Sequence, residues 1–238
     1  MRPAVRVLKR FVDVVGSTVG LAVTLPLYIP IAVAILAESP GPLFYVQRRA
    51  GRFIDDSNGG TWEEFDIYKF RSMAVDAERT TGAVISTPGD ARITKVGRVL
   101  RATRLDELPQ FWNVLRGDMS LVGPRPERPE LLRNLAMAIP FFEERTRGVK
   151  PGLTGLAQVS LGYTGAAAAG SAVTKLLETL TNPFDLPEAE GALADDMRLK
   201  LMFDLGYAAA LEDLWSYVRL EAWIIAKTPV VMAMSRGR

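Results

Sequence analysis

The feature that most constrains this chain is a run of 24 uncharged residues, 14–37, between Asp13 and Glu38. A helix needs about 20 apolar residues to cross a bilayer, so the run is long enough to do so. Pro26 and Pro30 interrupt it, and a proline inside a helix removes a backbone donor and clashes with the preceding turn. We therefore expect a kink or a break near Pro26.

Basic residues flank the run on both sides. The first twelve positions hold four basic residues and no acid, and three arginines follow between 39 and 53, again without an acid. Because basic residues favour the cytoplasmic side, both ends are expected there, as in a segment that enters the membrane and returns. Each arm of about 12 residues would be ~18 Å long, too short for a hydrocarbon core ~30 Å thick. A kinked spanning helix, a cleaved signal peptide and a buried core helix remain alternatives, although the run exceeds the roughly 7–15 residues of a signal peptide's apolar region.

The composition excludes several classes of site. The 238 residues include no Cys and no His, which rules out disulfides, thiolate nucleophiles, zinc fingers, iron–sulfur clusters and Ser-His-Asp triads. Catalysis would have to use carboxylates, Lys, Arg, hydroxyl groups, backbone amides or a hard metal held by oxygen. Basic and acidic residues are nearly balanced, at 29 against 27, and we expect no nucleic-acid partner.

The rest of the chain predicts an α+β fold that is predominantly helical. Residues 43–47 and the alternating segment 63–71 are expected to form a short β-hairpin with a long connection. Helices are expected over 72–79, over 92–104, over 127–145 with an interruption near Pro140, and over 197–234 with a break near Pro229. Loops or turns are expected over 80–91 and 150–155, and a mobile acidic insertion with one short helix (171–181) over 163–197. The aromatic residues of the last helices suit a membrane surface and core packing equally.

Two adjacent acids, Asp106 and Glu107, are the first candidate site residues. They and Pro109 are typical of the first turn of a helix, and Gly117 fits the end of that helix. Acidic helix starts are common, so helix capping alone would explain the pair.

Cations in the sequence suggest a second explanation. Arg101 belongs to a basic stripe with a spacing of three over 95–104, which suits a solvated helix face or an anion-binding surface. Arg125 lies between two prolines that fix its backbone, so its guanidinium can be aimed at a phosphate. Lys69 and Arg71 lie on the second predicted strand. Two carboxylates can also hold Mg²⁺ when substrate phosphates accompany it.

Several separate motifs together resemble the bacterial sugar transferase family, the monotopic polyprenyl-phosphate phosphoglycosyl transferases. The motifs are KRFVD (9–13), SPGPLFYVQRRAGR (39–52), YKFRSM (68–73), DARITKVGRVLRATRLDELPQFWNVLRGDMSLVGPRP (90–126) and KPGLTGLAQV (150–159). The resemblance covers roughly residues 5–160, with a weaker similarity at 200–235 that includes Asp204 and Tyr207. Many motifs in the same order are far more specific than one short motif.

The resemblance implies a reaction and a role for each candidate residue. A nucleoside diphosphate sugar, usually a UDP-sugar, would give its sugar phosphate to polyprenyl phosphate and release UMP. Asp106 would be the nucleophile that forms a covalent sugar-phosphoryl-aspartate, and Glu107 would act as a base or position Mg²⁺, so that both acids are expected metal ligands. Phosphate contacts are expected first from Arg101 and Arg125, then from Lys69 and Arg71.

The resemblance also implies where the protein works. Residues 1–38 would form a re-entrant membrane helix-break-helix, and 39–238 a catalytic domain on the cytoplasmic face of the bacterial inner membrane, with interfacial helices at 198–235. The break is a Ser-Pro pair in some family members and is Leu25-Pro26 here. The product would begin a surface glycan, such as an exopolysaccharide or lipopolysaccharide, and a homodimer is left open. A non-catalytic membrane anchor in glycan assembly is the alternative.

Overall fold

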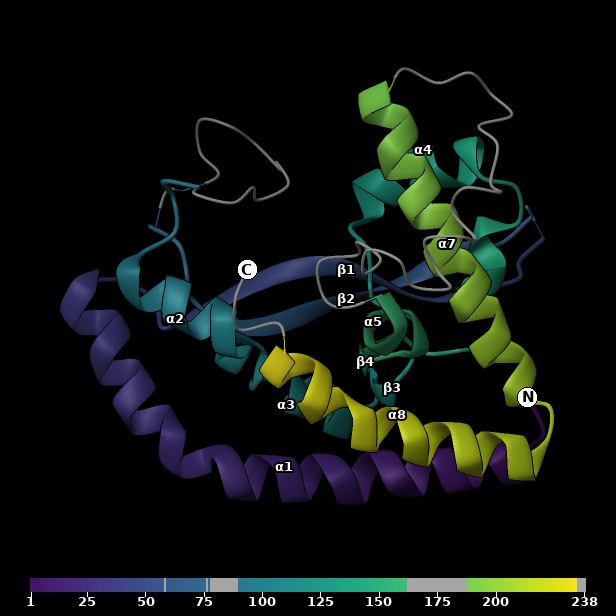
Figure 1. Ribbon diagram of the computed structural model, residues 1–238, viewed down its shortest axis with the longest axis horizontal. Coiled ribbons are helices and arrows are strands. Elements are labelled where there is room, and N and C mark those ends of the chain that lie inside the picture. The colour runs from purple at the N-terminus through teal and green to yellow at the C-terminus, as the bar shows by residue number, and fades with distance from the viewer. Residues whose placement is uncertain (58, 76, 78–89, 162–187, 235–238) are drawn as a thin grey trace.

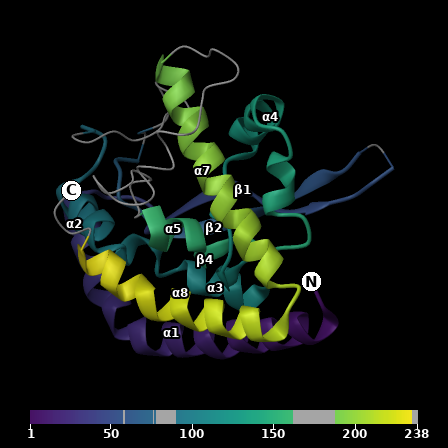
Figure 2. The same ribbon diagram turned by 45° about the vertical axis from the view of Figure 1, so that its right-hand side comes forward.

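The structure is a computed structural model, and it describes residues 1–57, 59–75, 77, 90–161 and 188–234. Helix α1 (Pro3–Glu38) and helix α8 (Leu214–Met234) lie side by side along one edge of the molecule (Figures 1 and 2). The hairpin β1–β2 (Phe44–Ile54 and Thr61–Phe70) crosses the middle. The other elements are α2 (Lys95–Thr103), a 3-10 turn (Leu105–Glu107), α3 (Gln110–Arg116), β3 (Ser120–Val122), α4 (Pro129–Ala138), a second 3-10 turn (Phe142–Arg145), β4 (Gly152–Thr154), α5 (Leu156–Leu161) and α7 (Glu188–Ala210).

The first half of α1 turns a polar face toward the protein. Lys9, Asp13 and Ser17 recur every fourth residue on one side of the helix and are buried. The Asp13 carboxylate accepts hydrogen bonds of 2.8 Å from the Ser120 hydroxyl and from the Leu121 backbone amide. Lys9 therefore does not serve as an exposed flanking charge, as the sequence suggested, but as part of the helix's attachment to the domain.

The opposite side of α1 exposes apolar side chains. The exposed residues of the first half include Val7, Phe11, Val15, Val19 and Val23. A helix on the surface of a water-soluble protein shows the reverse arrangement, so this face suits an apolar surrounding. Within the described part of the chain, α1 is the one helix long and apolar enough to cross a membrane.

Helix α1 bends sharply in its second half (Figure 1), as Pro26 and Pro30 inside it predict. The backbone remains helical through both prolines, so the expected break is a bend. The Thr24 hydroxyl donates to the Gly20 carbonyl (2.7 Å) and not to a carbonyl that Pro26 leaves unpaired. Beyond the bend, Ile31 and Ile35 pack with Phe70 and Leu100.

The predicted hairpin is confirmed, and its strands are longer than expected. They pair antiparallel, with a bulge between Ala50 and Phe53. A second sheet, the parallel pair β3–β4, was not predicted, because its three-residue strands lie in glycine- and proline-rich sequence that resembles turns. The described part of the protein is thus mostly helical with one longer hairpin, consistent with the expected fold class.

Three predicted elements need correction. Residues 72–75 are not helical. Met73 forms a β-bridge with Ile93, and the Ser72 carbonyl packs so closely on Gly97 of α2 that a Cβ atom there would overlap it. The last helical stretch breaks at 211–213 and not near Pro229, since Asp213 accepts from the Ser216 amide (2.9 Å) and starts α8. Residues 188–196 of the predicted insertion belong to α7. The rest of that insertion and most of the predicted loop 80–91 lie outside the described residues. The interruption expected near Pro140 is confirmed.

Candidate active site

The acidic pair lies in a tight turn between α2 and α3. Arg104 has a left-handed backbone (φ 59°) that ends α2 and reverses the chain into the 3-10 turn. Asp106 and Glu107 follow, and each is only 6% exposed. Neither side chain caps a helix: α3 begins after Pro109 without a side-chain cap. The structure thus removes helix capping as the explanation for the pair.

Glu107 is surrounded by cations. Its Oε1 lies 3.1 Å from Lys69 Nζ, 3.1 Å from Arg125 Nη2 and 3.9 Å from Arg104 Nη1. Burial opposes ionisation of this carboxyl, but the charges of Lys69, Arg125 and Arg104 outweigh burial and hold its pKa well below the usual range. Glu107 is therefore an ionised carboxylate that forms ion pairs with the surrounding cations.

Asp106 has a different environment. Its Oδ1 is buried and has no hydrogen-bond partner among the described residues. Burial, together with the adjacent charge of Glu107, raises the pKa of Asp106 to about 6. Two neighbouring acids with pKa values pushed apart are a common arrangement of catalytic sites.

The cations near the pair outnumber the acids. Burial lowers the pKa of Lys69, and Glu107 only partly restores it. Arg49, on β1, also faces this group: burial and the charge of Arg125 lower its pKa to about 10. Lys69, Arg49, Arg104 and Arg125 together leave an excess of positive charge, which would suit a bound anion.

The structure brings together most of the predicted site residues. Arg101 donates from Nε to the Ser72 hydroxyl (2.9 Å), and its charge acts to lower the pKa of Asp106. Arg71, by contrast, is buried at the end of α1, where it donates to the carbonyls of Ser39 and Pro40. The structure thus places Arg71 as a support for the α1 terminus and not beside the acids.

Sequence reasoning missed three residues near the pair. Arg104 was noted only as part of the basic stripe, although it directly precedes the acidic turn. Arg49 was noted only as a flanking charge; the hairpin register, which pairs Tyr45 with Lys69, places Arg49 on the same face as Lys69. Gln110, one helical turn after Asp106, is buried with its Nε2 unpartnered among the described residues.

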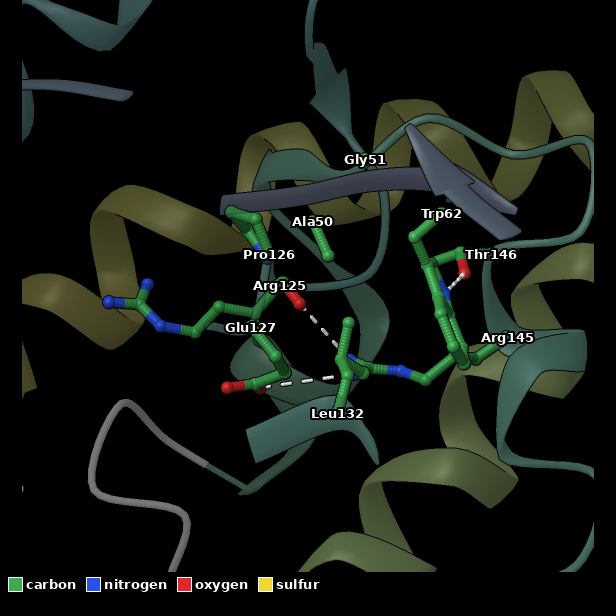
Figure 3. Close-up of a pocket in the computed structure, with 9 residues that line it drawn as sticks. All are labelled: Ala50, Gly51, Trp62, Arg125, Pro126, Glu127, Leu132, Arg145 and Thr146. Atoms are coloured by element: carbon green, nitrogen blue, oxygen red, sulfur yellow. Dashed lines mark hydrogen bonds and ion pairs between the residues drawn. The ribbon is translucent and has the colours of Figure 1, made fainter. Parts of the chain in front are cut away.

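A small pocket opens beside the segment that carries Arg125. It is lined by Ala50, Gly51, Trp62, Arg125, Pro126, Glu127, Leu132, Arg145 and Thr146. Figure 3 shows that the Arg125 side chain points away from Trp62 and Leu132. The acidic pair does not line this pocket, so we do not assign it to the reacting groups.

The acids fit a metal ion only if the substrate brings further ligands. Among the described residues, no group of three or more Asp or Glu side chains could hold a metal. Glu107 Oε1 is occupied by cations, whereas Asp106 Oδ1 is an acceptor with no partner in the part of the chain that the structure describes. Mg²⁺ usually keeps waters and substrate phosphates among its ligands, so one carboxylate oxygen from Asp106 is compatible with it.

Comparisons with known proteins identify the family and the relatives of this chain. A family model for bacterial sugar transferases matches residues 4–235. A UDP-N-acetylgalactosamine-undecaprenyl-phosphate N-acetylgalactosaminephosphotransferase of Aeromonas hydrophila is 44% identical over 161 residues, which are 68% of this chain and 36% of that protein.

Two further relatives are UDP-glucose:undecaprenyl-phosphate glucose-1-phosphate transferases. Those of Caulobacter vibrioides and Escherichia coli K12 are 45% and 42% identical over 66% and 65% of this chain. The matched segments cover 55% and 31% of those proteins, so the chain spans about a third to a half of the length of the relatives named here. The family match extends over nearly the whole chain and confirms the predicted resemblance: the chain belongs to the bacterial sugar transferase family.

Proposed function

We propose that this protein transfers a sugar 1-phosphate from a UDP-sugar to polyprenyl phosphate and releases UMP. The observation that carries the proposal is that the two adjacent acids have different surroundings. Glu107 is neutralised by Lys69 and Arg125, whereas Asp106 has a buried oxygen that no described residue contacts by a hydrogen bond, and a pKa raised to about 6. The names of the relatives supply the two substrates.

The proposed chemistry has two displacements. A carboxylate oxygen of Asp106 attacks the β-phosphorus of the UDP-sugar, and the bond from that phosphorus to the bridging oxygen breaks, so that UMP leaves with the bond's electron pair. An oxygen of polyprenyl phosphate then attacks the same phosphorus and displaces the Asp106 carboxylate. The products are polyprenyl-diphosphate sugar and the regenerated acid. A raised pKa makes the ionised Asp106 more basic and thus more nucleophilic, while it remains largely ionised at neutral pH.

The cations have a supporting part in this proposal. Phosphoryl transfer places charge on the non-bridging oxygens, and preorganised cations stabilise that charge. Arg125 and Lys69 are anchored by Glu107 near the reacting carboxylate, and Arg101 lies close enough to affect the pKa of Asp106. Asp106 is the residue that would hold Mg²⁺, which would supply further charge neutralisation when bound.

We also propose that α1 enters the membrane and returns. Its first half is tied to the domain through Lys9, whose Nζ lies 2.8 Å from Glu221 of α8, and its second half through Ile31 and Ile35. A helix that crossed the bilayer would carry one of these halves away from the domain. With both ends on the cytoplasmic face, the acidic pair would meet a soluble UDP-sugar and a membrane-borne acceptor.

The test is an assay of UMP release by purified protein with polyprenyl phosphate, Mg²⁺ and a panel of UDP-sugars. One sugar nucleotide should give release, Asp106→Asn should abolish it, and chelation of Mg²⁺ should stop it. Asp66→Asn, an exposed acid on β2 paired with Arg48, is the matched control and should retain activity. Release by none of the sugars would favour the non-catalytic anchor, and full activity of Asp106→Asn would refute the nucleophile.

A further inference from the structure

A second arginine, Arg145, contacts the backbone of Arg125. Arg145, from the 3-10 turn Phe142–Arg145, has a side chain only 3% exposed. Its Nη2 donates to the backbone carbonyl of Arg125 (3.2 Å), a contact drawn in Figure 3. The carbonyl of the residue that reaches Glu107 is therefore fixed by a buried guanidinium.

Arg145 is itself fixed by an acid from a distant helix. Its Nε and Nη2 both lie 2.8 Å from Oδ2 of Asp204 in α7, whose side chain is 2% exposed. Glu127 lies 3.9 Å from Nη1, and the Phe142 ring lies 5.0 Å from the guanidinium carbon. A planar guanidinium with this many buried partners is held in one orientation, so Arg145 can fix the group to which it donates.

The segment around Arg125 has other backbone supports. The Pro124 carbonyl accepts from the Gly152 amide (2.8 Å), and the Pro126 carbonyl accepts from Arg49 Nη1 (3.2 Å). Because neither proline can donate a backbone hydrogen bond, the segment is held chiefly through its carbonyl oxygens. The Arg145 contact acts on the carbonyl of Arg125 itself.

We propose that Arg145 and Asp204 are positioning residues: they fix the backbone at Arg125 so that its guanidinium meets Glu107 and the transferring phosphate. The chain of contacts runs from Asp204 through Arg145 and the Arg125 carbonyl to Glu107. The catalytic part of this inference depends on the proposed transferase function, whereas the backbone part does not.

The variant Arg145→Lys separates positioning from folding. A lysine keeps the positive charge beside Asp204, but one ammonium group cannot reproduce the fork that serves both Asp204 and the Arg125 carbonyl. Arg147→Lys is the matched control, because Arg147 lies two residues away and pairs with Asp55 and Glu144.

The first readout needs no activity. Within residues 123–127 only Gly123, Arg125 and Glu127 have backbone amides, because positions 124 and 126 are prolines; a peptide that begins upstream of Gly123 reports the hydrogen exchange of all three, including the Gly123 amide that donates to the Thr154 carbonyl (2.9 Å). Arg145→Lys should lose protection in this peptide relative to wild type, while Arg147→Lys should not. Unchanged protection in a folded Arg145→Lys protein would overturn the proposal whether or not the protein is a transferase.

The second readout is catalytic coupling. Arg145→Lys should lower kcat by about tenfold with a smaller change in KM, as expected for one lost charge-assisted hydrogen bond. In an Arg125→Gln background the same change should cost little more. Equal losses of kcat in both backgrounds would contradict positioning through Arg125. If the wild-type protein is inactive, the proposed function is refuted, and the hydrogen-exchange result alone decides this inference. If Arg145→Lys unfolds, Asp204→Asn takes its place in both measurements.

Discussion

Replacing Asp106 with Asn should make the protein more stable while it abolishes the proposed activity. Burial and the charge of Glu107 raise the pKa of Asp106 from 3.8 to about 6. At neutral pH the folded protein therefore holds an ionised carboxylate that would be more stable in the unfolded chain, where it meets water.

The magnitude follows from the two pKa values. Each unit between them is worth ~1.4 kcal/mol, so the ionised Asp106 costs up to ~3 kcal/mol above pH 6. Because the folded pKa lies above the unfolded one, this cost is absent near pH 4 and grows as the pH rises to 6. For a chain of this length, ~3 kcal/mol corresponds to roughly 6–12 °C in Tm.

The assay is thermal unfolding of the detergent-solubilised protein at pH 7.5 and at pH 4. Asp106→Asn should raise Tm at pH 7.5, and the difference should shrink toward zero at pH 4. The adjacent Glu107→Gln is the control with opposite sign. It leaves the buried Lys69 and the nearby Arg125 without their counter-charge and should lower Tm at pH 7.5.

A result in which both variants destabilise the protein at pH 7.5 would refute the argument from burial. So would a gain for Asp106→Asn that did not change between the two pH values, since a steric effect and not the carboxylate's charge would then explain it.

Three other predictions follow from the same structure. Lys9→Met should lower stability by about 3–5 kcal/mol, because it leaves Glu221 buried without its cation, and Glu221→Gln added to it should recover part of the loss in a thermal-unfolding assay. Single cysteines introduced at positions 2 and 236 of this cysteine-free chain should both resist a membrane-impermeant reagent added to the outside of intact cells; labelling of one alone would indicate a spanning helix. The rate of UMP release at subsaturating UDP-sugar, which reports the free protein, should fall as pH drops below about 6, because Asp106 gains a proton, and a flat pH profile of this rate between 5 and 7.5 would contradict its role as nucleophile.

The sequence predicted which of the candidate residues lie together better than it predicted the local structure around them. The adjacent acids and Arg125 could be selected because their residue types and spacing carry chemistry. Arg71 could not be separated from Lys69 by sequence alone, since both are cations on one face of the predicted strand 63–71, whereas β2 ends at Phe70. In the structure, Lys69 contacts Glu107 while Arg71 contacts carbonyl oxygens at the end of α1.

Helix α1 shows a similar limit. Its uncharged run and prolines predicted an apolar, bent segment, and the structure shows one. The burial of Lys9 and Asp13 was not predicted, because charges next to an apolar run usually face water. Their partners, Glu221 and Ser120, lie more than 100 residues away, so only the fold brings them together.

The central claim is that Asp106 carries the sugar phosphate, and the most direct measurement is to trap that intermediate. The protein is incubated with a UDP-sugar labelled in its β-phosphate, without the polyprenyl acceptor, then quenched and digested for mass spectrometry. The account predicts the labelled sugar phosphate on the peptide that contains Asp106, and none after Asp106→Asn. Label on another residue, or turnover with no covalent label at any time, would contradict it.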